Sequence, residues 1–410
     1  MDNLHFRIAI CTLFCYGRSE SIEEVVVIAR KLEARLVYLA EKYPVITLTG
    51  PRQSGKTTLV KKAFPDKKYV SLEDPDHRKF AQQDPRGFLK SYPDAVVDEA
   101  QYVPELFSYI QTKVDEENTP GQYILTGSQN FLLFEKITQS LAGRVAVLKL
   151  LPFSYAELSA SGIEEQYEHY LYNGFYPRIY DMNLSPEDFY PGYMQTYIER
   201  DVRLIRNITD LSRFQLFIKL CAGRTGQLLN ISSLADDCGI SRTTASGWIS
   251  ILEASYIIFL LRPHHRNFNK RLVKMPKLYF YDTGLAAYLL GINSIEQLET
   301  HYGKSALFES LVISELMKKA YNAGKEPHCF FWRNKTGNEV DLLIEEGSRI
   351  IPLEIKSGRT VNENYFRGLR YYRKISDSDE KGIVLFGGDY QQQRESSLVT
   401  SWKNISRLDF

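Results

Sequence analysis

Several features that would assign the sequence to a common class of protein are missing. The 410 residues carry 51 Lys and Arg against 50 Asp and Glu, a formal net charge of +1. No overall positive field therefore exists to hold nucleic acid, and any DNA contact must come from a local patch. The five cysteines are scattered and odd in number, with neither CxxC spacing nor a disulfide framework, which is typical of a reducing compartment.

Hydrophobic runs of membrane-spanning length are missing too, because no segment reaches the roughly 20 apolar residues that a spanning helix needs. The apolar stretch at 8–16 lacks a Lys/Arg-rich start, and no small-residue cleavage site follows it. We interpret residues 1–20 as a poorly defined leader. Together these absences predict a soluble, cytoplasmic protein with no membrane partner.

Common catalytic patterns are absent as well. The seven histidines show no metal-ligand spacing, and no Ser/His/Asp or Cys/His arrangement suggests a nucleophile. The chemistry of the protein must therefore be sought in other motifs.

What the sequence does contain is a long alternation of strands and helices. Short apolar strands are predicted at 45–49, 68–72, 95–97, 122–126 and 146–150, with helical stretches between them. This alternation is typical of a parallel sheet covered by helices on both faces. We expect an α/β multidomain protein, with this parallel-sheet domain over 21–160, a helical domain over 161–290 and a second α/β domain over 300–410.

A phosphate-binding motif follows the first strand. Residues 50–57 fit G-x-x-x-x-G-K-S/T between a strand and a helix, the context that this motif requires. Its glycines let backbone N–H groups close around phosphate oxygens, Lys56 reaches the β- and γ-phosphates, and Thr57 offers its hydroxyl to Mg²⁺. The predicted ATP-binding residues are Gly50, Pro51, Arg52, Gln53, Ser54, Gly55, Lys56, Thr57 and Thr58.

Residues at later strand ends complete a predicted site for ATP hydrolysis. Asp98 and Glu99 end an apolar strand, where Asp98 would bind the magnesium ion and Glu99 would polarise the attacking water. Ser128 or Gln129, after the next strand, would sense the γ-phosphate. Arg144 would complete the site of its own chain or that of a neighbouring subunit in an oligomer, and a surface ion pair is the plain alternative for it.

At this point the chain resembles a family of bacterial and archaeal predicted AAA-type ATP-binding proteins that end in a C-terminal domain of unknown function. The likeness is carried by the runs GPRQSGKTTL, VVDEAQ, LTGSQNF and SLAGRV, and it continues through 173–177, 197–201 and 282–285. It covers roughly residues 30–400. The resemblance implies an AAA-like P-loop ATPase domain joined to a winged helix and to a nuclease-like fold.

The middle of the chain contains a candidate DNA contact. Residues 232–248 indicate a helix, a tight turn and a second helix, and a basic segment at 263–277 follows as a candidate wing. The cations of that wing are His264, His265, Arg266, Lys270, Arg271, Lys274 and Lys277. We predict DNA contact at Arg242, Thr243, Thr244, Lys270, Arg271 and Lys274; the alternative is a rigid lid or subunit contact without DNA.

The C-terminal part carries charged residues on a predicted hairpin at 339–356. Alternation places Glu354 and Lys356 on one face of their strand. With Asp341 and with Glu309 from the preceding helix, this set resembles the PD-(D/E)XK nuclease superfamily, in which Asp341 and Glu354 would hold a divalent metal such as Mg²⁺ and Lys356 would orient a water. Glu315, further along that helix, is expected to be exposed.

The sequence thus predicts an ATP-binding and ATP-hydrolysing protein that uses Mg²⁺ and whose C-terminal domain binds DNA and cleaves it in a metal-dependent way. The alternative is a nucleotide-gated switch that binds DNA or an unidentified protein partner through a catalytically inert nuclease fold. In both cases ATP, sensed by Lys56, Asp98 and Ser128, would reorient the two downstream domains.

Overall fold

The computed structural model describes residues 28–128, 140–198, 210–264, 273–377, 379–394 and 397–408. Part of what the sequence predicts lies outside the described residues, namely the leader, Gln129, His265, Arg266, Lys270 and Arg271. Within the described ranges, no helix is both long and apolar enough to cross a membrane.

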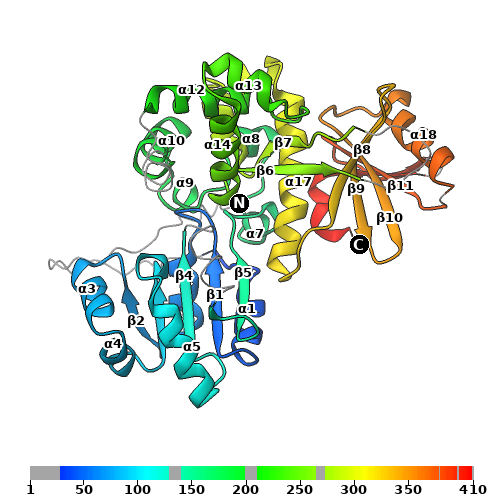
Figure 1. The fold of residues 1–410 in the computed structure, drawn as a ribbon. Helices are drawn as coiled ribbons and strands as arrows, with labels where there is room; N and C mark the ends of the chain where they lie inside the picture. The colour runs from blue at the N-terminus through cyan, green and yellow to red at the C-terminus, as the bar shows by residue number, and fades with distance from the viewer. Residues whose placement is uncertain are drawn as a thin grey trace, which may run out of the picture.

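The first sheet is a parallel sheet of five strands (Figure 1). β1 (Val45–Thr49) lies between β4 (Tyr123–Gly127) and β5 (Val145–Lys149), and β3 (Ala95–Asp98) and β2 (Lys68–Ser71) follow beyond β4. All four neighbouring pairs are parallel, so the carboxyl ends of β1, β3 and β4 meet at one edge of the sheet. The expected parallel-sheet ATPase architecture is confirmed.

Helices cover both faces of this sheet because its central strands are apolar on both sides. Ile46 and Leu48 pack into one core with α1 (Glu33–Ala40) and α2 (Lys56–Ala63), whereas Val45 packs into the core on the opposite face. That opposite core takes its helical residues from α3 (Pro75–Gln83), α4 (Pro85–Ser91), η1 (Ala100–Tyr102) and α5 (Leu106–Glu117). The two-residue period of a strand thus divides the domain into two apolar layers.

The second sheet is mixed, with eight strands in the order β12-β13-β11-β10-β9-β8-β6-β7. Its strands are β6 (Ile258–Pro263), β7 (Lys277–Phe280), β8 (Cys329–Arg333), β9 (Glu339–Glu346), β10 (Arg349–Lys356), β11 (Gly382–Phe386), β12 (Gln392–Arg394) and β13 (Ser397–Ser401). β6 pairs in parallel with β8, Arg262 opposite Phe330. The sheet therefore runs across 290–300, where the sequence indicated a boundary between two domains.

The remaining helices surround this second sheet. They are α7 (Tyr155–Ala160), α8 (Tyr167–Asn173), α9 (Pro177–Asp181), α10 (Pro186–Tyr193), η2 (Met194–Ile198), α12 (Leu211–Ala222), α13 (Ile231–Cys238), α14 (Arg242–Ala254), α15 (Thr283–Leu289), α16 (Ile295–Thr300), α17 (Lys304–Asn322), η3 (Glu363–Phe366), α18 (Arg367–Ser376) and η4 (Trp402–Arg407). Gly239 ends α13 with a left-handed φ of 62°, and the Ser241 side chain accepts from the backbone N–H of Thr244 to start α14.

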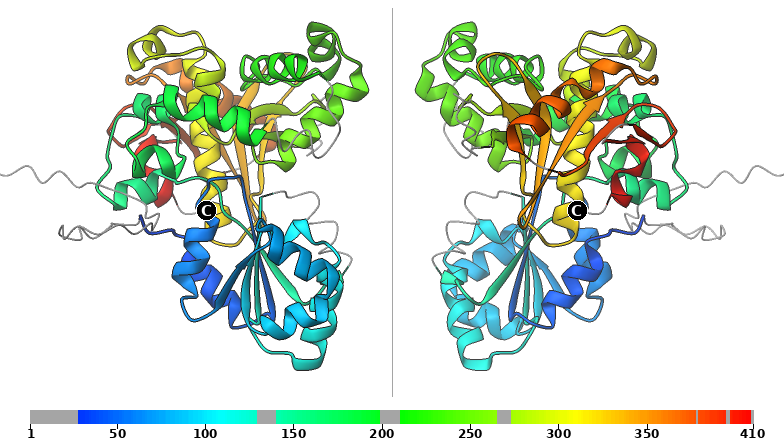
Figure 2. Two further views of the ribbon diagram at one scale, coloured as in Figure 1. Left: turned by 90° about the vertical axis from the view of Figure 1, so that its left-hand side faces the viewer. Right: turned by 90° about the vertical axis from the view of Figure 1, so that its right-hand side faces the viewer.

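One helix links the two halves of the molecule. The five-stranded sheet lies at one end, and the eight-stranded sheet lies at the other with its helices (Figures 1 and 2). α17, drawn in yellow, stands between the green helices and the orange strands, and it is buried along most of its length. Just beyond its C-terminal end, Glu326 pairs with Lys149 of β5 at 2.7 Å, so the helix reaches the ATPase sheet.

Candidate functional site

The phosphate loop joins β1 to α2 and adopts a backbone that its glycines permit. Gly50 has φ of 153°, and a Cβ there would stand 2.0 Å from the carbonyl oxygen of Leu150. Gly55, with φ of 90°, directly precedes α2. Lys56 is buried, and its Nζ donates to the carbonyl oxygens of Gly50 (2.9 Å) and Pro51 (2.8 Å). The ammonium group thus lies inside the loop, where the sequence predicts phosphate.

Asp98 meets the phosphate loop at the edge where the strands end. Thr57 Oγ1 donates to its Oδ2 at 2.9 Å, Tyr69 donates to the same oxygen at 2.6 Å, and the Thr126 hydroxyl donates to Oδ1. Burial, and after it the negative charge of Asp98, raises the pKa of Tyr69, which keeps that hydroxyl a donor. The structure therefore brings together Thr57 and Asp98, which stand 41 residues apart in the chain.

Thr57 and Asp98 also fit the magnesium ion that ATP chemistry requires. A hydroxyl and a carboxylate side by side at a phosphate loop are hard oxygen donors, and Mg²⁺ is commonly held by one or two carboxylates, substrate phosphates and waters. Among the described residues no group of three or more His, Cys, Asp or Glu side chains could hold a metal ion. Thr57 and Asp98 are the residues that would hold Mg²⁺ beside a bound nucleotide.

Glu99 is held next to Asp98 in an unusual backbone conformation. Its φ is 54°, in the left-handed region that non-glycine residues seldom adopt. Ser128 Oγ donates to Glu99 Oε2 at 3.2 Å, and the side-chain amide of Gln101 donates to the same oxygen. Ser128 and Glu99 thus lie together, as their predicted roles require. Gln101, Tyr69 and Thr126 had not been identified from the sequence as part of this site.

Arg144 lies away from the phosphate loop of its own chain. Its carbonyl accepts from the backbone N–H of Val45, at the amino end of β1, whereas the loop follows the carboxyl end of that strand. Its guanidinium pairs with Asp115 and also donates to the carbonyl of Ala142 at 3.0 Å. These contacts match the plain alternative, a surface ion pair, and leave action on a neighbouring chain as the remaining catalytic role.

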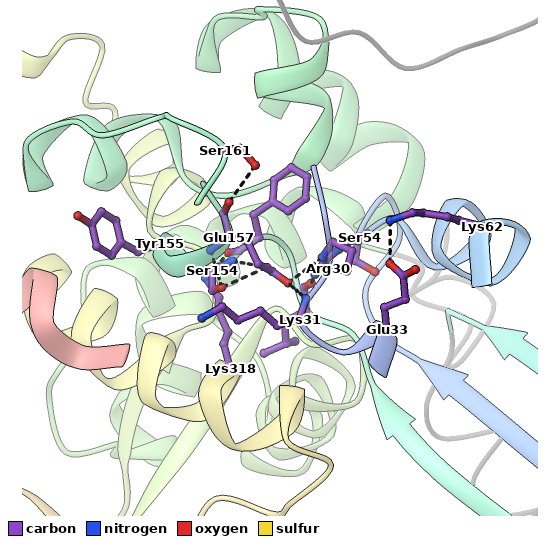
Figure 3. Close-up of polar contacts among 12 residues, drawn as sticks. Arg30, Lys31, Glu33, Ser54, Lys62, Ser154, Tyr155, Glu157, Ser161 and Lys318 are labelled. Atoms are coloured by element: carbon purple, nitrogen blue, oxygen red, sulfur yellow. Dashed lines mark hydrogen bonds and ion pairs between the residues drawn. The ribbon is translucent and has the colours of Figure 1, made fainter. Parts of the chain in front are cut away.

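A buried arginine ties the phosphate loop to the second half of the protein (Figure 3). Arg30 Nη1 donates to the Ser54 carbonyl and Nη2 to the Leu151 carbonyl, both at 2.6 Å, while Nε pairs with Glu157 Oε1 at 3.1 Å. Burial alone would raise the pKa of Glu157, but Arg30 and the backbone N–H groups of Ser154 and Lys31 hold it below its ordinary value. The pair is therefore ionised and almost fully shielded from water.

The contact continues from α7 to α17. The backbone N–H of Tyr155 donates to Glu315 Oε2 at 2.8 Å, and Lys318 Nζ donates to Glu315 Oε1 (2.8 Å) and to the Phe153 carbonyl (2.9 Å). Figure 3 shows Arg30 between Ser54 and Glu157, with Tyr155 and Lys318 in the same region. The expectation that Glu315 is exposed is wrong, because this side chain is 5% exposed and paired with Lys318.

A small cavity of about 30 Å³ opens beside the start of α2. It is lined by Ile28, Arg30, Glu33, Gly55, Thr58, Leu59, Lys62, Phe153, Pro177 and Asp181. Asp181, at the end of α9, is 4% exposed, and its Oδ2 has no hydrogen-bond partner in the described part of the chain. Burial raises the pKa of Asp181 to about 7, against the opposing charge of Arg30. The cavity therefore combines apolar walls with one unsatisfied acidic group.

The four charged residues predicted in the C-terminal part converge. Lys356 Nζ lies 2.7 Å from Asp341 Oδ2 and 2.5 Å from Glu354 Oε2, and Glu309 on α17 is close enough for the charge of Asp341 to act on it. Burial, followed by the negative charge of Asp341, raises the pKa of Glu354 well above its ordinary value. Glu354 and Lys356 share one face of β10, as expected.

This cluster also contains a cation that the sequence had assigned elsewhere. Lys277, the first residue of β7, is 3% exposed, and its Nζ lies 3.1 Å from Glu309 Oε1 and contacts Glu339. Its expected place in an exposed basic wing is therefore wrong, and so is that of His264, which is 5% exposed and lies 2.7 Å from Glu345. Each carboxylate of the cluster is thus paired with a lysine, and among the described residues no group of three or more His, Cys, Asp or Glu side chains is arranged to hold a metal ion.

The predicted DNA-contacting residues that the structure describes lie at the surface or close to it. Arg242 and Thr243 are exposed in the first turn of α14, Thr244 is half-buried, and Lys274 is exposed before β7.

Three family models match successive parts of the chain. A model described as AAA domain matches residues 42–159, one described as domain of unknown function (DUF8612) matches 164–296, and one described as domain of unknown function (DUF4143) matches 304–405. The first match covers the five-stranded sheet and the phosphate loop, and it agrees with the AAA-type assignment.

Relatives of similar length occur in bacteria and archaea. The uncharacterized protein Rv2008c of Mycobacterium tuberculosis is 30% identical over 348 residues, which cover 83% of this chain and 76% of the relative. The uncharacterized protein MJ1544 of Methanocaldococcus jannaschii is 24% identical over 394 residues, covering 87% and 84%. Among solved structures, the Walker-type ATPase PABY2304 of Pyrococcus abyssi matches 64% of this chain and 96% of its own at 17% identity, with a TM-score of 0.43. The chain belongs to the family of AAA-domain proteins that includes Rv2008c.

Proposed function

We propose that the protein binds ATP with Mg²⁺, hydrolyses it, and passes its nucleotide state through Arg30 to the helices and sheet that follow. The observation that carries ATP chemistry is the meeting of Lys56, Thr57 and Asp98 at the carboxyl edge of a parallel sheet. Thr57 and Asp98 would hold the ion, which supplies charge neutralisation to the phosphates when bound. Lys56 donates to phosphate oxygens in place of the loop carbonyls that it now contacts.

Glu99 is the proposed base. Its carboxylate is aimed by Ser128 and Gln101, so it can orient a water and accept its proton. Because Ser128 contacts Glu99, a γ-phosphate that draws the Ser128 hydroxyl away would also reposition Glu99. This arrangement supports the sensing role predicted for Ser128 from the sequence.

Replacement of Glu99 by glutamine tests hydrolysis separately from binding. The amide keeps the shape and hydrogen bonds of the side chain but accepts no proton, so the rate of phosphate release should fall by about 10²- to 10⁴-fold while ATP affinity stays within about threefold. Phosphate release with Mg-ATP and titration calorimetry measure the two quantities. Glu105→Gln, at an exposed glutamate nearby, is the matched control. Hydrolysis at the wild-type rate in Glu99→Gln would remove Glu99 from the mechanism.

The coupling route rests on burial as well as on contact. The Arg30–Glu157 pair and the Glu315–Lys318 pair are each almost completely shielded from solvent, so neither shifts without disturbing its neighbours. Arg30 holds the Ser54 carbonyl inside the phosphate loop, and Glu315 holds the backbone of Tyr155 from α17. A loop that rearranges around phosphate would therefore act on α17 through α7.

For the C-terminal part we propose a PD-(D/E)XK-like fold that binds without cutting. Support for the fold comes from the antiparallel β9–β10 hairpin, the parallel neighbour β11 and a helix, α17, that adds an acidic residue. Support for inertness comes from Lys277, a lysine outside the motif that pairs with Glu309 and Glu339. This is the switch alternative rather than the nuclease predicted first.

DNA is the proposed ligand of the middle segment. The order of elements is that of a winged helix, with α12, α13 and α14 followed by the β6–β7 hairpin. Arg242 and Thr243 are exposed at the start of α14, the second helix of the helix-turn-helix. An electrophoretic mobility shift with duplex DNA, with and without ATP, is the direct test.

A further inference from the structure

The carboxylate cluster of the C-terminal part contains one more cation than its motif supplies. Lys356 belongs to the strand β10, beside Glu354, as the motif requires. Lys277 comes from β7, the strand at one edge of the sheet, which is separated from β10 by β9, β8 and β6. Its Nζ lies 3.1 Å from Glu309 and also contacts Glu339, with the Phe331 ring 5.6 Å away.

The backbone holds Lys277 firmly in this position. β7 is paired antiparallel with β6, Lys277 opposite Leu261, and Lys277 forms an isolated bridge with Leu228 on its other side. Two residues later the Tyr279 hydroxyl donates to the same Glu309 carboxylate. The backbone that carries the Lys277 ammonium group is thus fixed by strand pairing, unlike that of a lysine on a surface loop.

The charges of the cluster are almost balanced by its own residues. The carboxylates are Glu309, Glu339, Asp341 and Glu354, and the cations beside them are Lys277, Lys356 and Arg333. At most one negative charge is left without a cation from the protein. A divalent ion entering here would meet two ammonium groups at close range, and like charges in a buried site repel strongly.

One of the four carboxylates, Glu354, is also covered by its surroundings. Glu354 is 4% exposed, and the backbone of α18 passes over it so closely that a Cβ at Gly368 would stand 2.0 Å from Glu354 Oε1. Asp341 Oδ2 already accepts from the backbone N–H of Ile355 at 2.8 Å and from Lys356. One oxygen atom each of Asp341, Glu354 and Glu309 is therefore engaged by a donor from the protein.

We propose that Lys277 is an internal cation that takes the place of a divalent metal in this cluster, so that the nuclease-like fold binds no metal ion and does not hydrolyse phosphodiesters. The proposal rests on the proposed fold of the C-terminal part and assigns its inertness to one residue. The same fold without that lysine regains a set of acidic ligands from α17, β9 and β10.

Manganese binding to nucleotide-free protein tests this directly, with the electron paramagnetic resonance signal of free Mn²⁺ as the readout. Wild-type protein should show no site that depends on Asp341. Lys277→Met, which keeps the apolar stem and removes the charge, should bind Mn²⁺ at least about tenfold more tightly than wild type. The double variant Lys277→Met/Asp341→Asn should lose that gain. Lys335→Met, at an exposed lysine between β8 and β9, should behave as wild type.

Two results would overturn the proposal. One is an Mn²⁺ site in wild-type protein that disappears in Asp341→Asn. The other is a folded Lys277→Met protein, judged by circular dichroism, that binds Mn²⁺ no more tightly than wild type; if Lys277→Met does not fold, Lys277→Gln takes its place, and the wild-type titration is decisive without either. ATP hydrolysis by the same preparations is scored separately, so loss of the ATPase proposal and loss of this one are distinguishable.

Discussion

Lys56→Ala should lower the affinity for ATP by at least about 100-fold, the largest effect expected of any single change in the phosphate loop. The Lys56 ammonium is buried inside the loop and donates to loop carbonyls. Its removal therefore takes away the positive charge that would face the phosphates. Titration calorimetry with ATP in the presence of Mg²⁺ measures the change.

The control for this change is Lys90→Ala, at an exposed lysine of α4 on the same domain, which should bind ATP as wild type does. Thermal melting of both variants separates lost binding from lost folding. Unchanged ATP affinity in a folded Lys56→Ala protein would refute the assignment of residues 50–57 as the phosphate site.

Glu157→Ala should cost about 3–5 kcal/mol of unfolding free energy, since it leaves the Arg30 guanidinium buried without its partner. The pair contributes through the ionised carboxylate, whose pKa is held below the ordinary value of 4.5. Its contribution is therefore present above pH 4.5 and is lost as the pH falls through the lowered pKa. Urea unfolding followed by tryptophan fluorescence at neutral and acidic pH measures both effects.

Glu164→Ala is the matched control on the loop after α7, where the carboxylate is exposed and its loss should cost less than about 1 kcal/mol. The difference between the unfolding free energies of the two variants should become smaller at acidic pH, because protonation removes the charge of Glu157 in the wild-type protein. A loss of unfolding free energy in Glu157→Ala equal to that in Glu164→Ala would contradict a stabilising role for the Arg30–Glu157 pair.

The parts that could be predicted from the sequence depend on short-range patterns. The five parallel strands follow from apolar runs, and the meeting of Thr57 with Asp98 follows from the rule that parallel strands end at one edge. The convergence of Asp341, Glu354 and Lys356 likewise follows from the two-residue period of a hairpin.

The parts that could not be predicted are charged residues whose partners lie far along the chain. Lys277 follows a run of basic residues and so indicated an exposed wing, but its partner Glu309 is 32 residues away on α17. Glu315 stands at a position of its helix that the sequence pattern assigns to solvent. In the structure it accepts a hydrogen bond from the backbone N–H of Tyr155, 160 residues earlier. Arg30 and Asp181 carry no local pattern at all, and only tertiary packing places them beside the phosphate loop.

Nucleotide bound at the phosphate loop should stabilise α17 as well as the loop. Hydrogen exchange of the wild-type protein with and without Mg-ATP tests this most directly. The account predicts slower exchange at the loop, at the backbone amides of Lys31 and Tyr155 that Glu157 and Glu315 accept from, and in the turns of α17 around Glu315. Protection confined to the loop, with Tyr155 and α17 unchanged by ATP, would contradict it.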